Sequence, residues 1–199
     1  ERDIAAEYGK VWTDEQANDA VGIGGLIVAQ RLLDLGGDTT TTAAHLSQRR
    51  FDMVAERVAS EPLAFRPGAE ALLDACADVG LPCAVVSTSP RHVLAAGLNR
   101  MPDRWFAAVV DGDAITHHKP DPEGYLTAAR RLDVDPADCL VIEDSEVGCA
   151  AGRASGAVVL AVPNMTPLPD SPGQVIRDSL VGLTVKDVED IWLRGRKGR

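Results

Sequence analysis

The sequence lacks any apolar run that approaches the roughly 20 residues needed to cross a bilayer. Its first residues, Glu1 to Ala5, have neither the basic start nor the apolar stretch of a signal peptide. We therefore expect no membrane partner, and a cytoplasmic location is the default prediction.

Cysteine pairs and basic clusters are also scarce. The four cysteines, Cys76, Cys83, Cys139 and Cys149, form no Cys-x-x-Cys pair and have no histidine at metal-ligand spacing, so we expect reduced, structural thiols. With 20 Lys and Arg against 30 Asp and Glu, the net charge of -10 would repel a nucleic-acid backbone. The only basic cluster is the last six residues, 194–199. We expect no nucleic-acid partner.

What the sequence does have is enough apolar material for a globular core, since 45% of its 199 residues are hydrophobic. Residues 1–62 carry apolar side chains at helical spacing and show no strand pattern. They predict a helical domain, with a helix opening at Thr13-Asp14-Glu15.

After Pro67 the pattern changes to short apolar, β-branched runs that alternate with amphipathic segments. Strands are predicted at 83–86, 106–110, 139–142, 158–162 and 179–181, and helices at 68–79, 90–99, 121–132, 145–155 and 185–193. This alternation predicts an α/β fold, a doubly wound, Rossmann-like parallel sheet with helices on both faces. The predicted organisation is a helical domain at 1–62, an α/β core at 63–193 and a basic tail at 194–199.

Polar residues that directly follow apolar strands are the first candidates for a site, because the carboxyl ends of parallel strands converge at one edge of the sheet. Ser87-Thr88-Ser89 follows the first predicted strand, and Pro90 opens a helix. Hydroxyls and N–H groups at a helix start suit a phosphate oxygen. The same residue types also cap helices that bind no ligand.

A lysine loop, 117–122, precedes another predicted helix and places the ammonium of Lys119 there. A single lysine is more often a solvated surface charge. His117 and His118 are adjacent in this loop and should point to opposite sides, so we do not expect them to share a metal ion.

Glu143-Asp144-Ser145 carries the strongest signal, because two carboxylates stand at the mouth of a predicted buried strand. Such a pair is costly unless a cation or hydrogen-bond donors neutralise it. Oxygen ligands without histidine or thiolate favour Mg²⁺, which proteins often share with a phosphate. The alternative is that Asp144 and Ser145 only cap the next helix. The three loops together predict a metal-phosphate site.

These loops resemble the second, third and fourth motifs of the haloacid dehalogenase-like hydrolases, within the branch of β-phosphoglucomutase and small-metabolite phosphatases. The likeness covers nearly the whole chain, and residues 1–62 match a helical cap inserted after the first motif. It implies that Ser87 and the N–H of Thr88 hold a phosphoryl oxygen, and that Lys119 offsets charge between nucleophile and phosphate. It also implies that Glu143 and Asp144 ligate Mg²⁺, directly or through water. The residues predicted to bind substrate are Gly24, Gly25, Ser87, Thr88, Ser89 and Lys119.

Two features depart from that family. The first motif, an apolar strand ending in Asp-x-Asp, does not precede the helical domain, and Asp111-Gly112-Asp113 follows a different strand. We therefore expect the nucleophile on a segment upstream of Glu1, whose strand would lie between those ending at Ser87 and Glu143. In the loop Gly22 to Gly25, Gly25 stands where the resembled phosphomutases carry an arginine, which favours a phosphatase over a mutase.

The predicted function is a magnesium-dependent phosphatase that acts on a small phosphorylated metabolite, such as a sugar or polyol phosphate. The resemblance implies attack by an aspartate, an aspartyl-phosphate and then hydrolysis by water. A β-phosphoglucomutase-like mutase is one alternative. A non-catalytic binding protein is the other, if no nucleophile exists upstream. The sequence does not specify the substrate or the oligomeric state.

Overall fold

The computed structural model describes residues 1–20, 24–164 and 166–198, and the chain divides into two compact units, Glu1–Glu61 and Pro62–Arg199. Gly22 and Ile23 of the predicted substrate loop lie outside the described residues. None of the helices among the described residues is long and apolar enough to span a bilayer. Each unit is described by itself.

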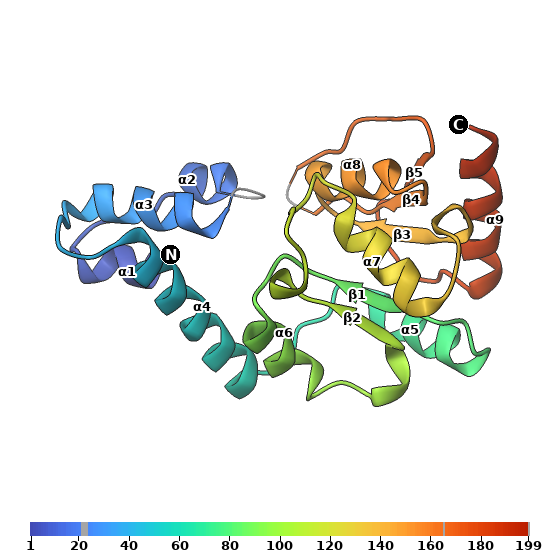
Figure 1. Cartoon of the computed structure of the whole chain (residues 1–199), viewed down its shortest axis with the longest axis horizontal. Coiled ribbons are helices and arrows are strands. Elements are labelled where there is room, and N and C mark those ends of the chain that lie inside the picture. The colour runs from blue at the N-terminus through green and yellow to red at the C-terminus, as the bar shows by residue number, and fades with distance from the viewer. Residues whose placement is uncertain (21–23, 165, 199) are drawn as a thin grey trace. The chain divides into compact units, whose positions relative to one another are not determined.

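The first unit is helical. Its elements are α1 (Arg2–Glu7), α2 (Asp14–Asp19), α3 (Gly25–Gly36) and α4 (Ala43–Ser60) (Figure 1). Thr13 begins α2 with a capping box, in which its hydroxyl accepts from the N–H of Gln16 and the Gln16 side chain accepts from the N–H of Thr13. One apolar cluster forms the core: Ile4, Ala5, Trp12, Val28, Ala29, Leu32, Leu33 and Leu46. The helical pattern predicted for this region is confirmed.

The second unit alternates strands with helices. Its strands are β1 (Ala84–Val86), β2 (Ala108–Val110), β3 (Leu140–Glu143), β4 (Val158–Ala161) and β5 (Gln174–Ile176). Its α-helices are α5 (Ala69–Asp78), α6 (Arg91–Leu98), α7 (Glu123–Leu132), α8 (Glu146–Ala154) and α9 (Val185–Lys197). Three short 3-10 turns complete it: η1 (Asp103–Trp105), η2 (Gly112–Ala114) and η3 (Pro136–Asp138).

All strand pairs are parallel, and they form two sheets. In the first, β1 pairs with β2, with Ala84 opposite Ala108. In the second, the order is β3-β4-β5, with Leu140 opposite Val158. Among the described residues, no ladder joins β1 to β3, so each of these strands has one partner strand only. The carboxyl ends of both strands carry the predicted site.

Helices cover both faces of the second sheet, because successive side chains of the buried strand β4 pack against different helices. Leu160 packs in a cluster with Leu72 of α5 and Ile191 of α9. The neighbouring Val159 packs in another cluster with Cys149 of α8. Successive strand residues point to opposite faces, so α5 and α9 cover one face and α8 covers the other. The predicted doubly wound α/β fold is confirmed.

Two predicted boundaries in the C-terminal part are corrected. The last strand lies at Gln174–Ile176 beside β4, whereas the segment 179–181 is a loop that packs against the turn at Gly68. The helix predicted to end at 193 continues to Lys197, so most of the expected basic tail is its last turn. The continuation fits because Gly195 is buried against Val158, where a Cβ would lie 2.2 Å from Cγ1.

Candidate functional site

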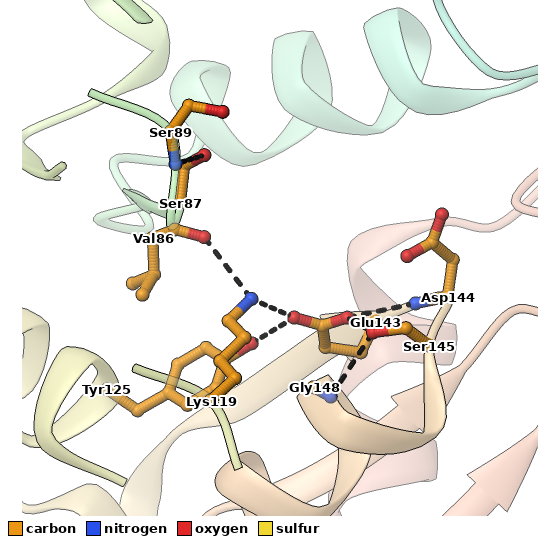
Figure 2. A network of polar contacts seen from close by, with 9 residues as sticks. All are labelled: Val86, Ser87, Ser89, Lys119, Tyr125, Glu143, Asp144, Ser145 and Gly148. Atoms are coloured by element: carbon orange, nitrogen blue, oxygen red, sulfur yellow. Dashed lines mark hydrogen bonds and ion pairs between the residues drawn. The ribbon is translucent and has the colours of Figure 1, made fainter. Parts of the chain in front are cut away.

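The predicted site residues of the second unit lie at the carboxyl ends of β1 and β3. The hydroxyl loop 87–89 follows β1 and leads into α6, while Glu143 is the last residue of β3 and Asp144 follows it. Lys119 comes from the loop before α7, a helix that packs against β1 and β2. Three loops thus bring their polar side chains to one place (Figure 2).

Lys119 and Glu143 form a buried ion pair between the two sheets. The Lys119 ammonium contacts Glu143 Oε1, and the exposed fractions of the two side chains are 16% and 8%. The same Nζ lies 3.5 Å from the carbonyl oxygen of Val86, the last residue of β1. Lys119 therefore bridges the strand ends that carry the hydroxyl loop and the carboxylate pair (Figure 2).

Both oxygens of the Glu143 carboxylate accept hydrogen bonds. Oε1 accepts from Lys119 and from the hydroxyl of Tyr125, while Oε2 accepts from the Asp144 N–H at 3.2 Å and the Ser145 hydroxyl at 3.3 Å. Burial raises the pKa of Glu143, but the Lys119 charge and these hydrogen bonds outweigh it and hold the pKa below its usual value. Glu143 is therefore ionised at neutral pH.

Gly148 of α8 makes room for this carboxylate. A Cβ at Gly148 would lie 2.1 Å from Glu143 Oε2 and 2.2 Å from its carboxyl carbon. The Gly148 N–H donates to the Ser145 hydroxyl at 3.2 Å, so Ser145 caps α8 while it also donates to Glu143. The start of α8 and the carboxylate are thus built as one hydrogen-bonded group.

Asp144 is the more accessible carboxylate. Its side chain is 48% exposed, and it pairs with Arg66, whose Nη1 lies 3.8 Å from Asp144 Oδ2. Arg66 itself is held by the carbonyl oxygens of Val162 and Pro163, each at 2.9 Å from a guanidinium nitrogen. A small cation could therefore reach Asp144 from solvent, with Arg66 fixed beside it.

Tyr125 and Arg66 were not predicted as site residues. Tyr125 lies in the first turn of α7, six positions after Lys119, and burial followed by the Glu143 charge raises the pKa of its hydroxyl, which stays protonated as a donor. Arg66 lies between the predicted helical domain at 1–62 and the helix predicted at 68–79. Neither residue carries a sequence signal for the site, because each meets its partner only through a contact between distant segments.

The hydroxyl loop is braced from the side of β2. The Ser89 N–H donates to Ser87 Oγ at 3.1 Å, and the Gly112 N–H donates to the Ser89 carbonyl at 2.8 Å. A Cβ at Gly112 would lie 2.4 Å from the Thr88 carbonyl oxygen, so only glycine allows this approach. Ser87 keeps its hydroxyl proton for a further acceptor, and the exposed Thr88 follows it.

Asp111 and Asp113 hold this loop in place. Asp111 is buried, accepts from the Asp113 N–H at 3.0 Å and pairs with Arg91 at 3.1 Å. Asp113 accepts from the Arg91 N–H at 2.9 Å and so caps α6. Both carboxylates are engaged in the loop structure, which fits the prediction that this Asp-Gly-Asp is a loop near the site.

Gly24 and Gly25 lie in the first unit. Gly24 precedes α3, and among the described residues no atom lies within 4 Å of a Cβ built on it. A Cβ at Gly25 would lie 3.0 Å from Ser47 Oγ and 3.1 Å from the Phe51 ring, so close packing of α3 on α4 accounts for this glycine. The predicted contact of both glycines with substrate stays a prediction.

His117 meets carboxylates rather than His118. One ligand atom each of His117, Asp121 and Glu123 lies within 4.8 Å of the others, and His117 Nδ1 is 2.9 Å from Glu123 Oε2. Glu123 accepts the N–H groups of Thr116 and His117, at 2.9 and 2.8 Å. The group therefore braces the loop that delivers Lys119.

The chain is similar to known proteins in sequence and in fold. A family model for haloacid dehalogenase-like hydrolases matches residues 1–156. The bifunctional riboflavin kinase/FMN phosphatase of Arabidopsis thaliana is 40% identical over 120 residues, 57% of this chain and 31% of that protein. The putative phosphatase YhcW of Bacillus subtilis is 38% identical over 122 residues, 60% of this chain and 54% of that protein.

A solved structure shares the fold. A mutant of CbbY from Rhodobacter sphaeroides, in complex with xylulose-(1,5)bisphosphate, superposes with a TM-score of 0.78 at 24% sequence identity. The match covers 92% of this chain and 86% of that chain. Against the two sequence relatives, the chain spans about a third of the first and about half of the second.

Proposed function

Because the chain belongs to the haloacid dehalogenase-like hydrolases, we propose that it forms most of a magnesium-dependent phosphatase for small phosphorylated metabolites. The observation that carries the proposal is the meeting of the Ser87 loop, Lys119 and the Glu143-Asp144 pair at the ends of β1 and β3. Relatives named as phosphatases, and a structural neighbour crystallised with a sugar bisphosphate, support the same substrate class.

The donors at this site fit magnesium, because the carboxylates of Asp144 and Glu143 are hard oxygen ligands placed side by side. Asp144 would bind the ion directly, since its oxygens are half exposed, while Glu143 has donors on both of its oxygens. When bound, the ion would neutralise charge on the phosphoryl group that is transferred.

The residues of this chain then have distinct tasks. Ser87 donates its hydroxyl proton to a phosphoryl oxygen, and the Thr88 N–H assists it at the same loop. Lys119 supplies a positive charge between the phosphoryl group and the attacking carboxylate, and Glu143 keeps the ammonium in place. The helical first unit acts as the cap that selects the substrate.

We assign the attacking carboxylate to a strand other than β1 to β5. Asp111 and Asp113 are engaged in holding the hydroxyl loop, and within the described part of the chain β1 and β3 each have one partner strand. A parallel strand between β1 and β3 that ends in Asp-x-Asp would satisfy both open edges and present its aspartate to Lys119. The cytoplasmic location expected from the sequence also remains a prediction.

The test is phosphate release by the full-length gene product. Phosphorylated sugars, polyols, small acids and nucleotides are each incubated with Mg²⁺ or with EDTA. We expect release from at least one substrate with Mg²⁺ and none with EDTA. Release that is unaffected by EDTA would contradict the metal site, and no release from any substrate would contradict the phosphatase.

Three further outcomes separate the alternatives. An isomerised product that retains its phosphate would identify a mutase. Loss of activity after Asp→Asn exchange at the first aspartate of an Asp-x-Asp motif in the full-length protein would support the assigned nucleophile. A full-length protein without such a motif and without phosphate release would be a binding protein.

A further inference from the structure

Tyr125 contacts both members of the buried ion pair. Its hydroxyl donates to Glu143 Oε1, the oxygen that the Lys119 ammonium also contacts. Lys119 Nζ lies 5.0 Å from the centre of the Tyr125 ring, within the range of a cation-π interaction. One side chain of α7 thus stabilises the position of an anion through its hydroxyl and of a cation through its ring (Figure 2).

A tyrosine that only fills a core would not need this arrangement. A partly buried tyrosine hydroxyl usually finds an acceptor, as Tyr8 does with Asp38 Oδ2 at 3.1 Å in the first unit. Asp38 and Glu143 both accept further donors on the other carboxylate oxygen, but the acceptor of Tyr125 is different because its Oε1 also pairs with the ammonium of Lys119. Four donors fix the carboxylate in one orientation.

We propose that Tyr125 is a positioning residue, which holds Glu143 toward the metal site and keeps Lys119 available to the phosphoryl group. The inference rests on the function proposed above. Without the hydroxyl, Oε1 would keep Lys119 as its main donor, and the ammonium would bind the carboxylate more tightly. Lys119 would then stabilise the transferring phosphoryl group less well, and Glu143 would contribute less to Mg²⁺ binding.

The discriminating variant is Tyr125→Phe, which keeps the ring and removes the hydroxyl. Tyr8→Phe removes the other tyrosine hydroxyl that donates to a carboxylate and is the matched control. For Tyr125→Phe in the full-length protein we expect about a tenfold lower kcat, with KM within about twofold. The reason is that the weakened interaction, between Lys119 and the transferring phosphoryl group, acts in the transition state. Calorimetry without substrate should show Mg²⁺ binding about fivefold weaker. Tyr8→Phe should change neither quantity.

A second variant, Tyr125→Leu, also removes the ring and should lower kcat further than Tyr125→Phe. Wild-type kcat and Mg²⁺ affinity in Tyr125→Phe would overturn the proposal, whatever happens to its thermal stability. If the wild-type protein releases no phosphate but binds Mg²⁺, the phosphatase fails and the Mg²⁺ affinity of Tyr125→Phe still decides the role of Tyr125. A wild-type protein that binds no Mg²⁺ would overturn both.

Discussion

Replacing Gly148 with alanine tests how closely the start of α8 is fitted to the Glu143 carboxylate. The new Cβ would lie 2.1 Å from Oε2 and 2.4 Å from Oε1, well inside any ordinary contact. The obstacle is a buried carboxylate with donors on both oxygens rather than the tip of a mobile side chain. The carboxylate must therefore move by close to an ångström, or α8 must shift.

The energetic consequence can be bounded from the bonds involved. The two hydrogen bonds to Oε2 are long, at 3.2 and 3.3 Å, and would be lost first. Each hydrogen bond to a charged group contributes about 1.5 to 3 kcal/mol, and long bonds lie at the low end of this range. Exchange of glycine for alanine within a helix stabilises the folded state by about 0.5 to 1 kcal/mol, which offsets part of this loss. We expect Gly148→Ala to lower the free energy of unfolding by about 2 to 4 kcal/mol and to weaken Mg²⁺ binding at least about tenfold.

Gly152→Ala is the matched control, since it lies one turn further along the same helix. The atoms nearest to its Cβ would belong to the side chains of Val159 and Val141, at 2.9 and 3.0 Å, so the substitution strains apolar packing rather than the carboxylate. Urea unfolding should show a loss for both variants, whereas calorimetry should show weaker Mg²⁺ binding for Gly148→Ala only. Equal Mg²⁺ affinities in wild type and Gly148→Ala would show that the position of the Glu143 carboxylate does not affect the metal site.

Three other perturbations have definite expected outcomes. Asp144→Ala should abolish measurable Mg²⁺ binding by calorimetry, and an unchanged affinity would place the ion elsewhere. The lowered pKa of Glu143 means that its contribution to stability is present above the ordinary carboxyl pKa of 4.5 and is lost as pH falls below it. In EDTA, the free energy of unfolding of Glu143→Gln should therefore fall less steeply than that of wild type as the pH is lowered. The same pH dependence in both proteins would argue against this. Burial raises the pKa of Cys83 to about 12 and that of Cys149 to about 11. Native protein at pH 8 should therefore react with iodoacetamide far more slowly than urea-unfolded protein. Equal reaction rates would show that the fold does not protect these thiols.

The sequence predicted the parts of the fold that depend on local pattern. Apolar runs that end in polar residues located β1 and β3, and the adjacent carboxylates Glu143 and Asp144 stood out because such a pair needs a counter-charge. The final strand was misplaced because Ser179, Leu180 and Val181 resemble a strand at least as well as Gln174–Ile176 does. Pairing with β4 makes the segment 174–176 the strand, and the sequence of a short segment does not show which distant strand it will pair with.

The rest of the site depends on contacts between distant segments. Arg66 is held by the carbonyl groups of Val162 and Pro163, almost a hundred positions along the chain, and backbone carbonyls carry no sequence signal. Helical spacing predicts which face of α7 is apolar, but not that the hydroxyl of Tyr125 meets Glu143. Such residues become visible only when the strands that carry their partners are in place.

If the charges at the ends of β1 and β3 stabilise the transferring phosphoryl group, the variant Lys119→Met of the full-length protein should lose most of its phosphatase activity. Lys186→Met removes an exposed lysine of α9 that pairs with two residues of its own helix, Glu189 and Asp190, and serves as the control. With the best substrate and saturating Mg²⁺, we predict that kcat falls at least about a hundredfold for Lys119→Met and stays within about twofold for Lys186→Met. A correctly folded Lys119→Met protein with the kcat of the wild type would show that this site does not carry out phosphate hydrolysis.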